Sequence, residues 1–316
     1  MTLDDFLIAC LLFANFFSAE MNLNNEVGFD RELPPPMFTG PMSPALKGQT
    51  RIKRPFYIIG HMVNSKEEVD KFLRKGSNAL EVDIEFADNG TVLGTYHGLP
   101  CDCFRGCFKR EPIGEFLDHV RNRTSMPHSK YRGRMSLLFL DLKTTKIPKK
   151  AKAVAGVTLA LNLVNHLWKG GFDVGMNDPL KSIARMYDKL GIKGHRWQGD
   201  GLSNCLRFLM PVDRLKAAVK LRDSEDGYVD KVYHWTIDLP YYIEKSVRLG
   251  VDGIITNQPH NVLGVVTSIF FQDRLRVASV NDSPWERVRR SPSEVIEDEE
   301  DMDTNIIGGE ETGAGE

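Results

Sequence analysis

The sequence predicts an α/β fold of the (β/α) TIM-barrel type, in which parallel strands alternate with crossover helices. From residue 55 onward, short apolar segments are separated by longer segments with helical periodicity. Strand followed by helix, repeated along a chain, is typical of a parallel sheet. Polar residues also gather where the predicted strands end, and in a (β/α) barrel that end carries the active site.

Six segments have the composition of barrel strands: 56–60, 79–86, 136–143, 194–199, 231–237 and 252–256. The first is followed by a helix that Asn64 or Ser65 caps, with Glu68 completing a capping box and Gly76 at its end. The other predicted helices are 112–123, 150–169, 179–190, 211–222 and 240–249. The helices at 179 and 240 each begin with a proline at the first helical position.

The polar residues at the predicted strand ends are His61, Glu81 with Asp83, Asp141 with Lys143, Asp200, Asp238 and Asn257. Glu81 and Asp83 are two residues apart in a strand, so both point to the same face. Burying two carboxylates side by side is costly unless a cation lies between them, and a hard divalent cation chooses oxygen ligands. A solvated strand face would show the same local alternation. The recurrence at several strand ends, together with His97 on a cysteine-rich loop, favours a reaction centre.

Both ends of the chain are predicted to lie outside the barrel. Residues 6–18 form a short apolar run typical of the core of a signal peptide, so we expect a signal peptide at 1–19 and a secreted protein. Residues 20–54 are punctuated by proline and glycine, and we expect a propeptide or a disordered leader there. The catalytic barrel would span 55–288, and the acidic tail at 289–316 would be disordered.

The net charge of −2 is unevenly distributed along the chain. Residues 291–316 hold ten acids and no Lys or Arg, which leaves 33 acids against 41 basic residues elsewhere. The excess of basic residues outside 291–316 suits anionic or phosphate-bearing partners, although modest basicity by itself selects no particular partner. No basic run interleaved with aromatic residues indicates nucleic acid.

The cysteine content supports secretion. Cys10 falls inside the predicted signal peptide, and four cysteines remain. Because Cys101 and Cys103 are too close to pair comfortably, we expect bridges Cys101–Cys107 and Cys103–Cys205. A zinc site is the alternative, but the spacing lacks the C-x₂-C pairs expected of one.

Eight motifs occur in order along the chain: GHMVN (60–64), LEVDIEF (80–86), TYHGLPCDC (95–103), FLDLK (139–143), GHRWQGDG (194–201), KVYHWTID (231–238), DGIITNQP (252–259) and NDSPWE (281–286). From about residue 54 to 288 the chain resembles the sphingomyelinase D/phospholipase D family of spider venoms, the dermonecrotic toxins, and their tick and mite relatives. The combination of HMVN, E-x-D and YHGxPCDC is far more specific than a generic barrel pattern.

The resemblance implies a role for each matching residue. His61 and His97 would be the catalytic pair, and Asp102 would orient His97. Glu81, Asp83 and Asp141 would hold one Mg²⁺. The phosphate and head group would be contacted by Lys143, Tyr233, Trp235, Asp238 and Asn257. The segment around NDSPWE would plug the far end of the barrel.

The implied activity is Mg²⁺-dependent release of choline from sphingomyelin and lysophospholipids at membrane surfaces by a secreted monomer. Internal attack by a lipid hydroxyl would give a cyclic phosphate, with one histidine as base and the other as acid; a covalent phosphohistidine is the older proposal. Two other functions stay open. One is an inactive secreted lipid-binding protein. The other is a glycerophosphodiester phosphodiesterase, although those enzymes usually place HD where this chain has His97 and Gly98.

The chain departs from the family pattern near residue 170. The family has two strand–helix units there, whereas this chain has only GFDVGMND (171–178) and the helix at 179–190. We therefore expect an incomplete barrel of about six strands that lacks about 45–50 residues. The metal ligands would survive, because they lie on the first three strands, but one wall of the pocket would be lost.

Overall fold

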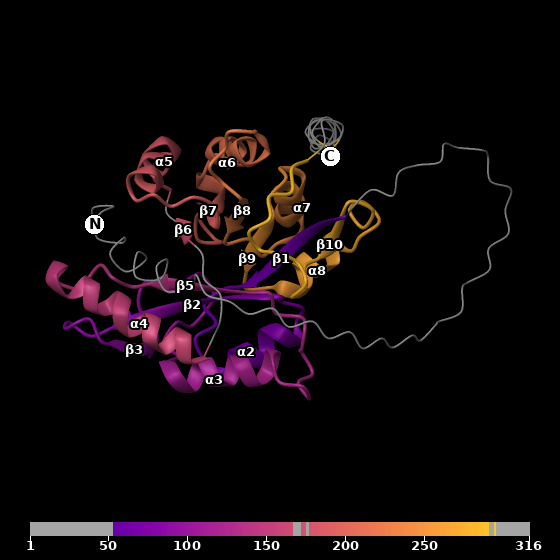
Figure 1. Cartoon of the computed structure of the whole chain (residues 1–316). Helices are drawn as coiled ribbons and strands as arrows, with labels where there is room; N and C mark the ends of the chain where they lie inside the picture. Colours follow the sequence, from indigo (N-terminus) through magenta and orange to yellow (C-terminus); the bar gives the residue numbers. More distant parts are fainter. Residues whose placement is uncertain (1–52, 167–171, 175–176, 291–293, 295–316) are drawn as a thin grey trace, which may run out of the picture.

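Seven parallel strands form the centre of the described part of the molecule (Figure 1). The computed structural model describes residues 53–166, 172–174, 177–290 and 294. In order across the sheet the strands are β5 (Leu137–Leu142), β2 (Ala79–Phe86), β1 (Arg54–Gly60), β9 (Gly253–Thr256), β8 (Lys231–Trp235), β7 (Arg196–Gly201) and β6 (Phe172–Val174). Six of them correspond to the predicted strands, and β6 was not predicted.

Helices cover the outer face of this curled sheet (Figure 1). They are α2 (Lys66–Arg74), α3 (Ile113–Thr124), α4 (Lys152–His166), α5 (Leu180–Lys189), α6 (Asp213–Asp223), α7 (Pro240–Arg248) and α8 (Pro259–Val266). Each predicted helix is present in the described residues, although the last three residues of the predicted helix 150–169 lie outside them; α8 was not predicted. At α2 the hydroxyl of Ser65 accepts the N–H of Glu68, as the capping pattern predicts. Pro179 lies at the N-cap position of α5, one residue before the first helical position where it was predicted.

Strands β1 and β9 are buried along their whole length, which explains their nearly continuous apolar sequence. On β1, Phe56 and Ile58 pack outward in the cluster formed with α6, α7 and α8. Tyr57 and Ile59 point inward and pack with Trp197 from β7. The alternation along a single strand therefore supplies both the inner and the outer core.

A hairpin and a C-terminal segment complete the sheet. Strands β3 (Val92–Thr95) and β4 (Glu111–Pro112) extend it antiparallel from β2, and the loop 96–110 between them lies at the carboxyl end of β2. Strand β10 (Leu275–Val277) pairs with the start of β1. Beyond it, the carbonyl of Pro284 accepts the indole N–H of Trp197 at 2.9 Å, and Trp285 stacks on His195 with centroids 5.0 Å apart. This is the predicted plug at the amino end of the strands.

The barrel is open between β5 and β6, because no ladder joins these two strands in the described residues. All seven residues of β1 are buried, but only one of the six in β5 is.

The prediction of an incomplete barrel is confirmed, although its strand count was one too low. The three-residue β6 is too short to show a periodic pattern, and it makes α5 the second half of an ordinary strand–helix unit. The sheet is therefore one strand short of the eight in a complete (β/α) barrel, and not two strands short as the sequence predicted.

The predicted signal peptide and most of the leader and tail lie outside the described residues. Within the described ranges, no helix combines the length and apolar character needed to cross a bilayer.

Candidate active site

Three carboxylates converge at the carboxyl end of the first strands. Asp83 on β2 is the cross-strand partner of Asp141 on β5, and Glu81 lies two residues earlier on the same face of β2. One oxygen from each of the three lies within 4.8 Å of the others. Strand register alone therefore assembles an all-oxygen ligand set of the kind that Mg²⁺ or Ca²⁺ prefers.

Lys143 supplies the positive charge within this cluster. Its ammonium lies 2.8 Å from Asp83 Oδ1 and 2.6 Å from Asp141 Oδ2. Burial lowers the pKa of Lys143, but the charges of Asp141 and Asp83 outweigh burial, so the pKa is raised. The lysine thus pairs with two of the three acids.

Glu81 is the carboxylate that the lysine leaves unneutralised. Burial, followed by the charge of Asp83, raises its pKa to about 8. The N–H of Met62 donates to Glu81 Oε2 at 2.7 Å, from a left-handed residue with φ of +48°. A buried acid beside two others, already held by a backbone donor, fits a divalent cation bound at this position.

Asn64 holds Asp83, a role that neither its place in GHMVN nor its expected helix cap had indicated. Its Nδ2 donates to Asp83 Oδ2 at 2.6 Å, and its Oδ1 accepts the backbone N–H of Asp83 at 3.0 Å. The carboxylate is therefore fixed by a residue from another strand end.

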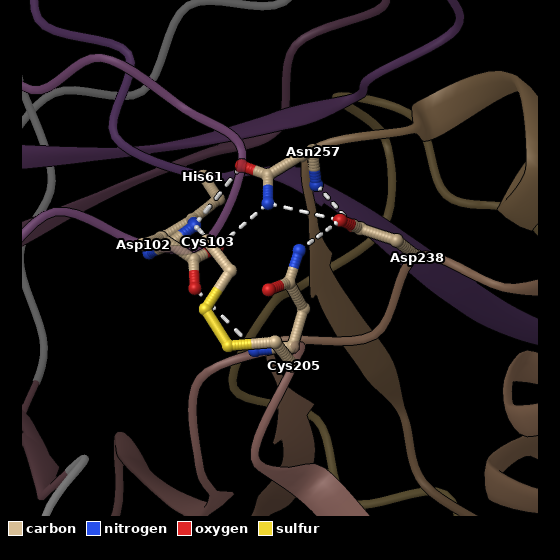
Figure 2. Close-up of a disulfide and its surroundings, with 7 residues drawn as sticks. His61, Asp102, Cys103, Cys205, Asp238 and Asn257 are labelled. Atoms are coloured by element: carbon tan, nitrogen blue, oxygen red, sulfur yellow. Dashed lines mark hydrogen bonds and ion pairs between the residues drawn. A yellow bond between two sulfur atoms is a disulfide. The ribbon is translucent and has the colours of Figure 1, made fainter.

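His61 follows β1 and lies in a network of polar side chains (Figure 2). Its Nδ1 is 3.1 Å from Asn257 Oδ1 and 3.4 Å from Asp102 Oδ2. The Nδ2 of Asn257 donates to Asp102 at 2.7 Å and to Asp238 at 3.0 Å, so its oxygen is the atom that faces the ring. Burial opposes the charged ring, but Asp102 and the charge of Glu81 outweigh it, so the pKa of His61 is raised.

The expected pairing of Asp102 with His97 is wrong. Asp102 lies against His61, and the Nδ1 of His97 instead donates to the carbonyl of Gly98 at 2.7 Å. A carbonyl can only accept, so this contact places the hydrogen of a neutral ring on Nδ1 and leaves a lone pair on Nε2. The correction arises because loop 96–110 folds back so that residue 102 reaches the end of β1.

Two disulfides fix this loop, and their pairing is the expected one. Cys101 is bonded to Cys107, and Cys103 is bonded to Cys205. Next to the second bridge, Asn204 donates its backbone N–H to Asp102 at 3.3 Å and its side chain to Asp238 at 2.6 Å. The bridge thus joins the histidine network to the loop after β7 (Figure 2).

Asp238 and Asn257 belong to this supporting network. Asp238 accepts the backbone N–H of Asn257 at 2.7 Å and the hydroxyl of Thr256 at 3.0 Å. Asn257 bridges two carboxylates and His61. Their hydrogen bonds position the histidine, and their expected contacts with a head group stay predictions.

The remaining expected residues lie in different surroundings. Tyr233 is buried inside the barrel and donates to Asp173 Oδ2 of β6 at 2.7 Å. Trp235 is half-buried at the end of β8 and packs against the inner aromatic cluster. Asp200 is ion-paired with Arg214 of α6 at 2.8 Å, so it contributes to the outer layer of the fold.

A family model described as dermonecrotic toxin SPH matches residues 51–171 and 169–285. The chain is 43% identical to the dermonecrotic toxin SPH of Ixodes scapularis, covering 75% of this chain and 77% of the relative. It is 39% identical to the dermonecrotic toxin StSicTox-betaIB1i of Sicarius terrosus, covering 74% and 99%. A putative glycerophosphoryl diester phosphodiesterase from Silicibacter pomeroyi has a TM-score of 0.44 at 14% identity, covering 71% of this chain and 96% of that one.

The same alignments locate the missing segment. Because 74% of 316 residues is about 234, about 46 of the 280 positions aligned with the Sicarius toxin have no residue in this chain. The family match divides at residues 169–171, on the stretch of chain between β5 and β6. A segment of this size corresponds to about one strand–helix unit, in agreement with the single strand that the sheet lacks.

Proposed function

The chain belongs to the dermonecrotic toxin SPH family, and on this premise we propose that it is a Mg²⁺-dependent phospholipase D that releases choline from sphingomyelin and lysophospholipids. The observation that carries the proposal is the convergence of Glu81, Asp83 and Asp141 at the strand ends that also bear His61 and Lys143. Oxygen ligands, a cationic side chain and imidazoles are the groups that phosphodiester cleavage needs.

The three carboxylates would hold the cation, which would supply charge stabilisation to the phosphate oxygens as the bond to the attacking oxygen forms. Lys143 lies beside the same ligands and would contact a phosphate oxygen there. Together, the divalent cation and the ammonium of Lys143 would offset the repulsion between an anionic phosphodiester and an attacking hydroxyl.

The two histidines would then divide the proton transfers. His97, with a lone pair on Nε2, would take the proton of the lipid hydroxyl that attacks phosphorus. The bond from phosphorus to the choline oxygen would break, and that oxygen would receive a proton from His61. The raised pKa of His61 favours its protonated form near neutral pH, as an acid requires. The products would be choline and a cyclic phosphate.

A membrane surface is the partner that we propose for this end of the barrel. Among the described residues, six of the fifteen exposed large apolar side chains lie in segments that follow strands at this end: Leu99, Phe104, Phe108, Leu206, Leu209 and Leu239. Exposed apolar residues gathered around a site typically mark an interaction surface. The two disulfides accord with a secreted protein, and we propose that it acts as a monomer.

Choline release from sphingomyelin vesicles tests the proposal directly. We expect release with Mg²⁺, its loss in EDTA, and at least a hundredfold loss in His97→Asn because the base is removed. Release from glycerophosphocholine but not from sphingomyelin would favour a glycerophosphodiester phosphodiesterase. The open edge between β5 and β6 favours one further candidate, an inactive lipid-binding protein, and vesicle binding without any release would support it.

A further inference from the structure

We propose that Arg105 is a positioning residue that couples the two halves of the site, the turn that carries His61 and the cluster of carboxylates. Arg105 lies in the short ring closed by the Cys101–Cys107 disulfide. The inference rests on the function proposed above, and neither the motifs nor their spacing assigned this residue a role.

The guanidinium of Arg105 donates to groups from three different elements. One nitrogen donates to the carbonyl of His61 and, at 2.7 Å, to Asn257 Oδ1. The other donates to the carbonyl of Met62 at 2.6 Å and to Glu68 Oε1 at 3.1 Å. Its side chain is only 13% exposed. A planar fork with several donors can bind four acceptors at fixed angles, which an ammonium cannot reproduce.

The first branch leads to the histidine. Asn257 Oδ1 accepts both from Arg105 and from the ring of His61, so the arginine fixes which end of the amide faces the ring. The amide nitrogen then faces Asp102 and Asp238. Without the guanidinium, the amide would lose one of the two donors that set its orientation.

The second branch leads to the metal ligands. Glu68 accepts from Arg105 with one oxygen and from the N–H of Asn64 with the other at 3.0 Å, and the side chain of Asn64 holds Asp83. The carbonyl of Met62 is bound by Arg105, while the N–H of the same residue donates to Glu81. One side chain therefore stabilises the turn that aligns two of the three carboxylates.

Three variants test the role of Arg105: Arg105→Met, Arg105→Lys and, as a matched control, Arg110→Met. Arg110 is on the same loop, where it pairs with Glu85 at 2.9 Å, is 57% exposed and lies over the ring of Tyr96. The readouts are kcat and KM for choline release, the affinity for Mg²⁺ alone by calorimetry, and the ¹⁵N shifts of the His61 ring without substrate. A thermal transition of wild-type shape checks that each variant is folded.

We expect kcat and Mg²⁺ affinity to fall about 10- to 100-fold in both Arg105 variants, as for other residues that orient metal ligands, with KM changed less than threefold. The His61 ring shifts should change in both, and Arg110→Met should match the wild type in every readout. Either Arg105 variant that folds and keeps both kcat and Mg²⁺ affinity within threefold of the wild type overturns the inference. If the wild type itself releases no choline, the proposed function fails, and the Mg²⁺ affinity and ring shifts still decide the role of Arg105.

Discussion

Replacing Glu81 with Gln should change how the stability of the metal-free protein depends on pH. In the folded protein burial and Asp83 raise the pKa of Glu81 from 4.5 to about 8. The unfolded chain therefore releases this proton near pH 4.5, while the folded protein keeps it until about pH 8. The contribution of Glu81 to stability is complete below pH 4.5 and is lost progressively as pH rises to 8.

The magnitude follows from linkage. At 1.36 kcal/mol per pH unit, the rise from 4.5 to about 8 means that ionising Glu81 in the folded state destabilises the metal-free protein by about 5 kcal/mol above pH 8. The glutamine oxygen can still accept the N–H of Met62, but its buried amide nitrogen would offset about 1–3 kcal/mol of the gain. Above pH 8, Glu81→Gln should therefore be more stable than the wild type by about 3 kcal/mol in EDTA.

The assay is urea denaturation in EDTA at several values between pH 5 and pH 9, with disulfides intact. Glu85→Gln is the control, because Glu85 lies on the same strand and pairs with the exposed side chain of Arg110. The difference in unfolding free energy between wild type and Glu81→Gln should grow with pH, and saturating Mg²⁺ should reverse its sign because the variant has lost a ligand. A difference that stays constant from pH 5 to pH 8 in EDTA would refute the reasoning.

Three further predictions concern the network and the fold. Asp102→Asn should lower the pKa of His61, so the fall of kcat at high pH should begin at lower pH; an unchanged pH–rate profile would contradict this. Replacing both Cys103 and Cys205 with Ser should reduce stability by about 4–5 kcal/mol, because their bridge closes a loop of about a hundred residues; denaturation with a loss below 1 kcal/mol would count against it. Asp252→Ala should destabilise the protein by about 3–5 kcal/mol, because it removes the buried carboxylate that Arg54, Arg222 and Lys231 share, and a thermal midpoint equal to the wild type would argue otherwise.

The parts of this protein that sequence patterns predicted depend on local periodicity. Glu81 and Asp83 share a face because strand side chains alternate, and Asp141 joins them because parallel strands end together. The apolar repeats also placed the six longer barrel strands and most helices. The three-residue β6 escaped because a period of two cannot be recognised in so few residues. The catalytic and binding roles of the site residues stay predictions until activity is measured.

Contacts between loops could not be predicted in the same way. That Asp102 faces His61 rather than His97, and that Arg105 binds the carbonyls after β1, depends on the path of a loop folded back by two disulfides. The sequence by itself determined the barrel class and the cluster of three acids, because strand alternation is a property of short segments. It also predicted the cysteine pairing that the two disulfides confirm. Only the tertiary structure decided which side chain supports which histidine, because those partners come from loops far apart in the chain and meet only when the strand ends are brought together.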